Sequence, residues 1–436
     1  MISILRLTDP DDRRRAEALL GRLRLDPRSL VLSSSGDDRA VQEILADVAR
    51  RGDDAIVDAA HRFDDPGFTA AQIRVSPEEM KIAASRIPAP LMAALARSID
   101  QVREYQSKVM PAGESSFRRD GVELGLRFTP LDSAGLYFPG GKASYPSTLI
   151  MLAIPAQVAG VKQIVVCSPP TKHGRSDLVL AACHQVALTH VFRAGGVAAI
   201  GAMAFGTATI PPVDKILGPG NRYVQLAKRA LAGGVGIDGF LGPSEILVIA
   251  DETGDARYIA ADLLAQAEHD PGSCFLLTTS ETLAEQVAAE IERQRSSLSR
   301  VAAIDRSLHS DSAILLCPSI DVAIDWANRF AAEHVNIQTR DDNAVLARLR
   351  HAGAIFLGPH SPVAAGDYVA GPSHCLPTNT TARFASGVSV HEFLKRTSIE
   401  RYTPRGLAAD ASAIIALAEA EGLDAHAESV RARAGR

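Results

Sequence analysis

Short apolar runs alternate with longer amphipathic segments through the middle of the 436-residue chain. The runs are rich in Val, Ile and Leu, which is typical of strands buried on both faces. In the longer segments apolar positions recur every three or four residues, which predicts helices that bury one side. The predicted strands are 164–167, 190–193, 215–217, 246–250, 274–278, 313–317, 335–338 and 354–357. The predicted helices between them are 177–188, 197–205, 222–232, 257–269, 281–293 and 320–332.

This alternation predicts an α/β fold in which parallel sheets are covered by helices on both faces. A Gly-Pro-Ser-Glu turn at 242–245 separates the earlier strand-helix units from the later ones. We therefore expect two sheets in the chain.

The two ends of the chain lack the alternation. Helices are expected at 37–51, at 54–61, from the capped start at Ser76, and at 90–110, followed by a hairpin that turns at Asp120-Gly121. After Gly366 the alternation stops, and the remainder reads as helical, closing with segments 413–421 and 424–433. Such a tail has no sheet of its own, so it must pack on another part, for which a second subunit is a candidate.

The bulk composition favours a soluble protein that handles small molecules. A hydrophobic fraction of 46% is enough for a large core, and mixed charges with a net charge of -5 argue against nucleic-acid and membrane partners. Five widely spaced cysteines without a C-x-x-C motif argue against disulfides and a thiolate zinc site. The charged segment 1–20 lacks a signal peptide's apolar core, and the apolar run 149–161 contains Pro155, so we expect a cytoplasmic location.

Three glycine-rich turns open predicted helices in the first α/β half. They are Pro139-Gly140-Gly141, Gly195-Gly196 and Gly218-Pro219-Gly220-Asn221. Backbone amides at such turns bind phosphate groups, although the same turns also occur as plain strand-to-helix geometry. None of them has the GxGxxG spacing of a dinucleotide fingerprint.

Four side chains are candidates for a metal site. Gln266 and His269 share one face of a predicted helix, and Asp367 lies in a Gly/Pro-rich loop that we expect at the carboxyl edge of a sheet, seven residues before His374. Together with His426 they offer nitrogen and oxygen ligands that suit zinc better than magnesium. The alternatives are a surface histidine at 269, a turn residue at 367 and a solvent-exposed histidine at 426.

A Glu-His dipeptide, Glu333-His334, lies at a helix-to-strand junction and runs into the apolar stretch 335–337. A buried carboxylate beside an imidazole is a plausible acid/base pair. The alternative is a histidine favoured by the dipole at the end of a helix.

Eight segments in chain order carry a more specific pattern. They are GLYFPGGKASYPSTLIMLAIPAQVAG, DKILGPGN, GPSEILVIAD, LLAQAEHDP, AAEHVNI, GPHSPVAAGDYVAGPSH, TARFASGVSVHEFLKR and EGLDAHAESVR. Together they cover nearly the whole chain and resemble the successive blocks of the histidinol dehydrogenase family. The resemblance implies oxidation of L-histidinol through histidinaldehyde to L-histidine, the last step of histidine biosynthesis, with two NAD and one zinc ion (Zn2+) per subunit.

The resemblance also implies roles for individual residues. It implies zinc ligands at Gln266, His269, Asp367 and His426, and a catalytic pair at Glu333 and His334. Besides the zinc ligands, substrate contacts fall on Ser244, His334, His374 and Glu421, and cofactor contacts on Tyr137 and Asn221. The family is homodimeric, with shared active sites to which an intertwined tail would bring Glu421 and His426 of the other subunit.

The implied architecture is two incomplete Rossmann-like domains with helical extensions at both ends. We expect an N-terminal helical extension at 1–30 and a discontinuous larger domain, with the zinc and catalytic residues, at 31–136 and 245–388. An inserted NAD-binding domain is expected at 137–244, and a helical tail at 389–436 would pack on the partner subunit.

Two departures from the family pattern lie beside these sites. Ala198 stands where the family has a cofactor-binding Gln, and the family's Pro-Glu-His-Leu-Glu reads Ala332-Glu333-His334-Val335-Asn336. A related zinc/NAD dehydrogenase of another polar alcohol, such as a sulfonated diol, is therefore an alternative. A zinc hydrolase would leave the glycine-rich turns unused, and a non-catalytic binding protein would leave Glu333-His334 without a purpose.

Overall fold

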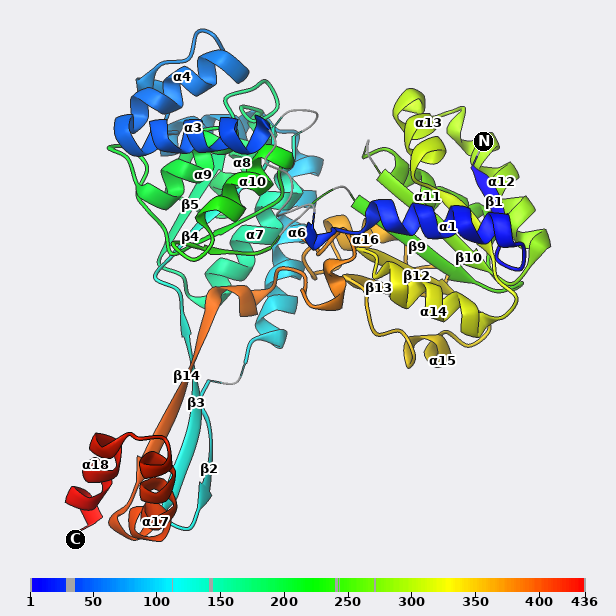
Figure 1. Cartoon of the computed structure of the whole chain (residues 1–436). Helices are drawn as coiled ribbons and strands as arrows, with labels where there is room; N and C mark the ends of the chain where they lie inside the picture. The colour runs from blue at the N-terminus through cyan, green and yellow to red at the C-terminus, as the bar shows by residue number, and fades with distance from the viewer. Residues whose placement is uncertain are drawn as a thin grey trace.

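The structure is a computed structural model that describes residues 2–28, 36–111, 113–140, 144–239, 242, 244–269 and 272–434. It consists of two α/β bodies that lie side by side and a thin arm that projects away from them (Figure 1). Each body is built on one parallel sheet, so the predicted α/β fold with two parallel sheets is confirmed, and the arm adds a third, antiparallel sheet.

The first body, called here the six-stranded body, has the strand order β1-β11-β10-β9-β12-β13. The strands are β1 (Ser3–Arg6), β9 (Ser244–Ala250), β10 (Gly272–Thr278), β11 (Ala313–Leu316), β12 (His334–Gln338) and β13 (Ala354–Leu357). One face is covered by α1 (Pro10–Leu23), α14 (Ile320–Phe330) and α15 (Asp342–Leu346). The other face is covered by α11 (Ala256–Ala267), α12 (Glu281–Arg295), α13 (Val301–Ser310) and α16 (Val363–Tyr368). Alternate residues of each strand point to opposite faces, so both faces need apolar side chains.

The second body, called here the five-stranded body, has the strand order β6-β5-β4-β7-β8. The strands are β4 (Ser133–Tyr137), β5 (Gln163–Ser168), β6 (His190–Arg193), β7 (Lys215–Leu217) and β8 (Gly236–Ile237). One face packs against α3 (Gly36–Arg51), α4 (Asp53–Phe63), α9 (Gly196–Phe205) and α10 (Arg222–Leu231). The other packs against α5 (Pro77–Arg86), α6 (Ala89–Val109), α7 (Pro146–Ala159) and α8 (Asp177–Gln185).

The helices at 36–109 cover a different sheet from the one expected. The expected domain division places residues 31–136 with the later half of the chain, but α3 and α4 share a core with α9 and the five-stranded sheet. The contact is close because Leu45 and Val48 pack onto Gly201 of α9, which has no side chain to hold them away. The apolar stripes of these helices predict that one side of each helix is buried, but they do not indicate against which sheet it packs.

The first residues also differ from the expected helical extension at 1–30. Ser3–Arg6 forms β1, which pairs in parallel with β11 at one edge of the six-stranded sheet, and only then does α1 begin. Four residues with two apolar positions are too short for their periodicity to indicate a strand.

The five-stranded sheet has a point where its strand order reverses. The chain passes from β4 through β5 to β6 on one side, then returns to β7 and β8 on the other side of β4. Ligands of open α/β sheets bind at the carboxyl ends of the two strands that flank such a point. Here those strands are β4, which ends at Tyr137, and β7, which is followed by Gly218.

The arm is an antiparallel sheet of order β14-β3-β2 with two helices at its tip (Figure 1). It contains β2 (Ser115–Arg119), β3 (Val122–Pro130), β14 (Leu394–Tyr402), α17 (Pro404–Ala420) and α18 (Asp424–Ala434). The hairpin at Asp120-Gly121 is confirmed, with φ of 40° and 85° at the two turn residues. The expectation of an all-helical tail at 389–436 is wrong for 394–402, because β14 is polar on both faces and so lacks the alternation that predicts strands.

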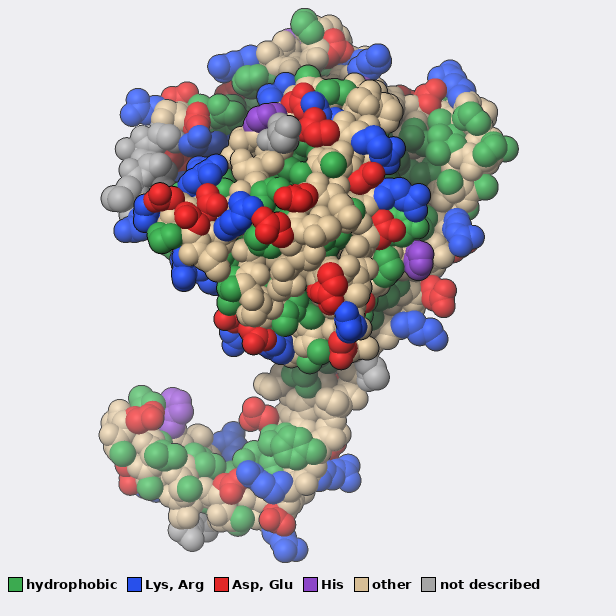
Figure 2. Space-filling view, turned by 90° about the vertical axis from the view of Figure 1, so that its right-hand side faces the viewer, with side chains coloured by type: hydrophobic (Ala, Val, Ile, Leu, Met, Phe, Trp, Pro, Cys, Tyr) green, Lys and Arg blue, Asp and Glu red, His purple; other side chains and the backbone are tan. Residues whose placement is uncertain are grey.

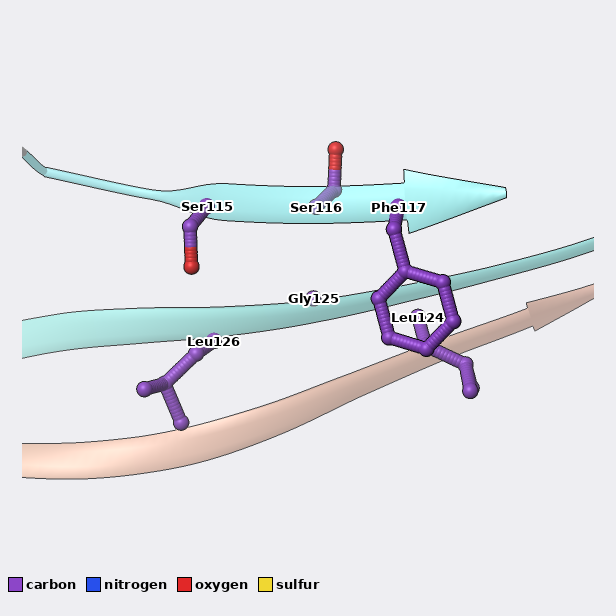
Figure 3. Close-up of a pocket in the computed structure, with 6 residues that line it drawn as sticks. All are labelled: Ser115, Ser116, Phe117, Leu124, Gly125 and Leu126. Atoms are coloured by element: carbon purple, nitrogen blue, oxygen red, sulfur yellow. The ribbon is translucent and has the colours of Figure 1, made fainter. Parts of the chain in front are cut away.

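The arm exposes apolar side chains beyond its own packing. Phe117 is 62% exposed and Leu417 is 66% exposed. A shallow groove of about 300 Å³ runs over β2 and β3, and Phe117 and Leu124 lie together at one end of it (Figure 3). In the space-filling view the arm stands clear of the bodies on a narrow stem (Figure 2).

Candidate active site

The candidate catalytic residues lie at the amino edge of the six-stranded sheet. Ser244 and Glu245 begin β9, and Glu333 directly precedes His334, the first residue of the neighbouring β12. Glu333 and His334 are each 5% exposed and Glu245 is 3% exposed. The predicted pair is therefore brought together in a buried position between two central strands.

Asp367 also reaches this amino edge, and not the carboxyl edge that we expected. The chain leaves β13 at Leu357, turns, and runs back along the face of the sheet as α16, which packs against α11. Asp367 near the end of α16 places Oδ1 3.8 Å from Nε2 of His334. The expectation followed the strand that ends before the loop and missed the short returning helix.

His334 is oriented for proton transfer. Its Nδ1 lies 3.1 Å from the backbone oxygen of Glu245, which can only accept, so Nδ1 donates and Nε2 keeps its lone pair. Burial lowers the pKa of His334 to about 4, although Asp367 acts in the opposite direction. The ring is therefore neutral near pH 7 and can accept a proton at Nε2.

Glu333 is a carboxyl group held away from water. Its Oε2 accepts a hydrogen bond from the backbone nitrogen of Glu245 at 2.9 Å and interacts with the hydroxyl of Ser244. Burial, together with the negative charges of Glu245 and Asp367, raises the pKa of Glu333 well above its usual value. The same Oε2 is 3.5 Å from Nδ1 of His334, so the carboxyl group adjoins the ring.

Glu245 is a third ionisable group that the sequence reasoning missed. Its Oε1 accepts a hydrogen bond from the backbone nitrogen of Asn379 at 2.8 Å, and burial raises its pKa to about 8. The one indication in the sequence was an acidic residue at the start of the apolar run 246–250.

His374 links this edge to the five-stranded body. Its Nδ1 lies 2.8 Å from the backbone oxygen of Asp367, and its Nε2 lies 3.0 Å from Oγ1 of Thr148 on α7. Because the carbonyl can only accept, Nδ1 donates and Nε2 accepts from the threonine. His334 and His374 line one cavity of about 750 Å³, whose walls include Phe356 and Ser389. The cavity offers room for a small polar substrate between the two bodies.

Three of the four candidate metal ligands lie in this region. Gln266 is 3% exposed, and its amide nitrogen has no hydrogen-bond partner among the described residues. His269 retains an exposed surface, but the protein atoms around it desolvate the ring and lower its pKa, while the charge of Asp367 acts to raise it. An unsatisfied buried amide, whose oxygen and nitrogen can exchange places, beside an imidazole and a carboxylate fits the donor set of zinc.

His426 and Glu421 are not brought to this region by the same chain. His426 lies on α18 and Glu421 ends α17, and both are exposed at the tip of the arm (Figure 1). Accordingly, the described residues contain no group of three or more His, Cys, Asp or Glu side chains placed to hold a metal ion.

The candidate cofactor residues lie at the switch point of the five-stranded sheet. The hydroxyl of Tyr137 accepts a hydrogen bond from the backbone nitrogen of Gly196 at 3.2 Å, and Asn221 caps α10. Gly218 has φ of 124°, and a Cβ there would lie 1.8 Å from the backbone oxygen of Tyr137, so only glycine fits. Gly141 of the first turn lies outside the described residues.

A buried ion pair that the sequence reasoning missed holds the Gly218 turn. Lys228 and Asp238 pair with fully buried side chains. The carboxylate of Asp238 accepts a hydrogen bond from the backbone nitrogen of Gly218 at 2.6 Å. The amino group of Lys228 donates a hydrogen bond to the backbone oxygen of Gly218 at 3.0 Å. Both backbone groups of the turn are thus fixed by charged partners.

The two departures from the family pattern have different consequences. Ala198 is 2% exposed in α9 and offers no polar side chain. Asn336 is fully buried, donates to the backbone oxygen of Ser361 at 3.2 Å and accepts from Gln338 at 2.8 Å. It therefore ties β12 to the turn that precedes α16 and Asp367.

Comparison with known proteins agrees with the resemblance. The sequence model of the histidinol dehydrogenase family matches residues 31–434. The chain belongs to the histidinol dehydrogenase family. The histidinol dehydrogenase of Gluconobacter oxydans is 45% identical over 413 residues, which cover 94% of this chain and 96% of that protein. The enzyme of Bradyrhizobium diazoefficiens is 47% identical over 401 residues, covering 92% and 93%.

A solved structure of the family supports the fold. The crystal structure of histidinol dehydrogenase from Elizabethkingia anophelis matches with a TM-score of 0.92 and 33% identity over 99% of this chain and 98% of that one. Family membership makes this chain an oxidoreductase of the histidinol dehydrogenase type. Among the helices of the described residues, none is long and apolar enough to cross a lipid bilayer.

Proposed function

We propose that this family member oxidises L-histidinol through L-histidinaldehyde to L-histidine, with two NAD and one zinc ion at each active site. The observation that carries the proposal is the neutral His334 ring beside Asp367, on the edge to which Gln266 and His269 also belong. A proton acceptor next to a set of metal donors is the arrangement that alcohol oxidation requires.

The chain's own donors would hold the metal and the substrate. Gln266, His269 and Asp367 would supply three zinc ligands, and His426 of the partner subunit would supply the fourth. Ser244, His374 and Glu421, the last of them from the partner, would bind the polar groups of the substrate along with the ligands and His334. Zinc, when bound, orients the substrate through its nitrogen atoms and lowers the cost of its alkoxide, and NAD, when bound, accepts a hydride in each oxidation.

Proton transfer would fall to the buried pair. His334 accepts the hydroxyl proton at Nε2 as the alcohol is oxidised, because its lowered pKa keeps that nitrogen free. In the second oxidation it acts again on the hydrated aldehyde. Glu333 orients the water that hydrates the aldehyde, and burial raises its pKa above the usual value of a carboxyl group.

The two bodies would divide the reaction between them. We propose that the five-stranded body binds NAD at Tyr137, Asn221 and the glycine turns, and that the six-stranded body binds zinc. The hydrogen bond between Thr148 and His374 joins the two at the cavity. The arm supports a homodimer in which each arm completes the partner's site, since apolar side chains of the arm such as Phe117 and Leu417 are exposed in the part of the chain that the structure describes.

The direct test is NADH absorbance with purified, zinc-loaded protein, L-histidinol and NAD. The proposal expects NADH formation that stops when a chelator removes zinc and returns when zinc is restored. The matched control is His334→Asn, which should bind zinc and remain inactive. Oxidation of a sulfonated diol without any oxidation of L-histidinol would contradict the proposal and favour a related dehydrogenase.

A further inference from the structure

Asp64 lies against the helix start at the carboxyl edge of the five-stranded sheet. It caps the end of α4, and a Cβ added to Gly195 would lie 2.6 Å from Oδ2 of Asp64. The neighbouring Gly196 donates its backbone hydrogen bond to Tyr137, whose pKa is raised by burial and, further, by the charge of Asp64. The carboxylate, the Gly195-Gly196 turn and the Tyr137 hydroxyl therefore form one cluster.

Among the residues that the structure describes, no cation balances the Asp64 carboxylate. Within the described residues it makes no side-chain hydrogen bond or ion pair, whereas the adjacent Asp65 pairs with Arg175 at 2.6 Å. Arg193, at the end of β6, pairs with Glu79. Partial burial alone raises the pKa of Asp64 to about 6, so the group is charged at pH 7.5 despite its surroundings. A half-buried, unpaired charge is costly to keep unless it meets a ligand.

The topology indicates which ligand group belongs there. The strand order β6-β5-β4-β7-β8 matches the 3-2-1-4-5 part of the six-stranded dinucleotide-binding order, in which an acidic residue near the strand beside the first one binds the ribose hydroxyls of NAD. Here that strand is β5, which ends at Ser168 and is followed by Pro169-Pro170, with no acidic side chain. Gly195 touches both Pro169 and Asp64, so Asp64 brings a carboxylate to the place where β5 supplies none.

We infer that Asp64 binds the 2′,3′-diol of the cofactor's adenosine ribose and makes the enzyme prefer NAD to NADP. The inference rests on the proposed function, because it assigns a residue to the NAD site of that reaction. Two ribose hydroxyls would donate to a carboxylate that has no partner among the described residues, whereas a 2′-phosphate would meet the negative charge of that carboxylate. Asp64 would also supply a polar contact to the cofactor, which the apolar side chain of Ala198 does not offer.

The test is calorimetric titration of the full-length protein with NAD and with NADP, alongside steady-state kinetics. Asp64→Ser removes the charge and keeps a small polar group, and Asp64→Glu keeps the charge on a longer side chain. Asp58→Asn is the matched control, because it removes an exposed carboxylate of the same helix that pairs with Arg51. Melting temperature and dimer content report whether each variant is folded.

We expect Asp64→Ser to weaken NAD binding about tenfold, the loss of one hydrogen bond to a charged group. NADP should bind more tightly, so the ratio of the two dissociation constants narrows, while kcat at saturating NAD changes little. Asp64→Glu should keep the preference for NAD, and the Asp58 control should behave as wild type. An unchanged ratio in folded Asp64→Ser would overturn the inference. If wild type binds NAD but does not oxidise L-histidinol, the proposed function fails instead.

Discussion

Nδ1 of His334 donates to the backbone oxygen of Glu245 at 3.1 Å, and this one contact sets which nitrogen of the ring faces the cavity. The donor and acceptor belong to adjacent parallel strands, where His334 pairs in register with Ile246. The orientation of the proposed base is therefore fixed by the sheet and does not depend on a flexible side chain.

Replacing His334 by Asn should abolish NADH formation and leave the zinc content unchanged. Asn can keep a polar group near Glu245, but it cannot accept a proton. Activity is followed by NADH absorbance and zinc by atomic absorption. Full activity in the variant would show that another group takes the proton, and loss of zinc would assign His334 to the metal site instead.

Replacing Glu245 by Gln should make stability less dependent on pH. A carboxyl whose folded pKa is about 8 binds more protons in the folded than in the unfolded state between about pH 4.5 and 8, so its contribution is lost as pH rises. The melting temperature of the variant minus that of wild type should therefore increase between pH 5.5 and pH 8. Parallel melting profiles of the two proteins would show that Glu245 titrates normally.

Replacing Lys228 by Met should destabilise the protein by about 3–5 kcal/mol, because it leaves the buried Asp238 charge without its partner. The Gly218 turn should loosen, so NAD affinity should fall as well. Lys228→Met combined with Asp238→Asn removes both charges and should recover part of the stability. Chemical denaturation and NAD titration check both effects, and a single variant as stable as wild type would contradict the prediction.

If the arm of each subunit completes the active site of the other, two inactive variants should complement each other in a mixed dimer. His334→Asn and His426→Asn should each be inactive as pure homodimers. In a mixed dimer, one site carries both changes and the other carries neither, so random mixing should restore about one quarter of wild-type activity. Mixing after reversible dissociation, with each variant alone as control, tests this. If all ligands of a site come from one chain, mixing restores nothing.

The sequence predicted the parts of the site that have local patterns. Glu333, His334 and the strand that follows them were identifiable because a charged pair directly precedes an apolar run. Gln266 and His269 were singled out by helical spacing, but α11 ends at Ala267, and His269 lies in the turn that follows, where its backbone nitrogen donates to the backbone oxygen of Gln266 at 3.2 Å. These predictions needed only neighbours in the chain.

The remaining features depend on contacts distant in the sequence. Asp367 reaches the amino edge because the short helix α16 turns back, and nothing local sets that direction. β14 escaped notice because its stability comes from pairing with β3, residue by residue from Leu394 opposite Pro130 to Tyr402 opposite Val122, and not from an apolar face. Asp64 becomes a candidate for cofactor binding only because it lies against Gly195, which comes more than a hundred residues later in the chain.

The measurement that tests the account most directly is the stoichiometry of the complete reaction. Limiting L-histidinol is incubated with excess NAD and the zinc-loaded protein, and NADH and L-histidine are both quantified at the end. The account predicts two NADH and one L-histidine for each L-histidinol consumed, because one site performs both oxidations. A single NADH with free aldehyde as the product, or no NADH at all, would contradict it.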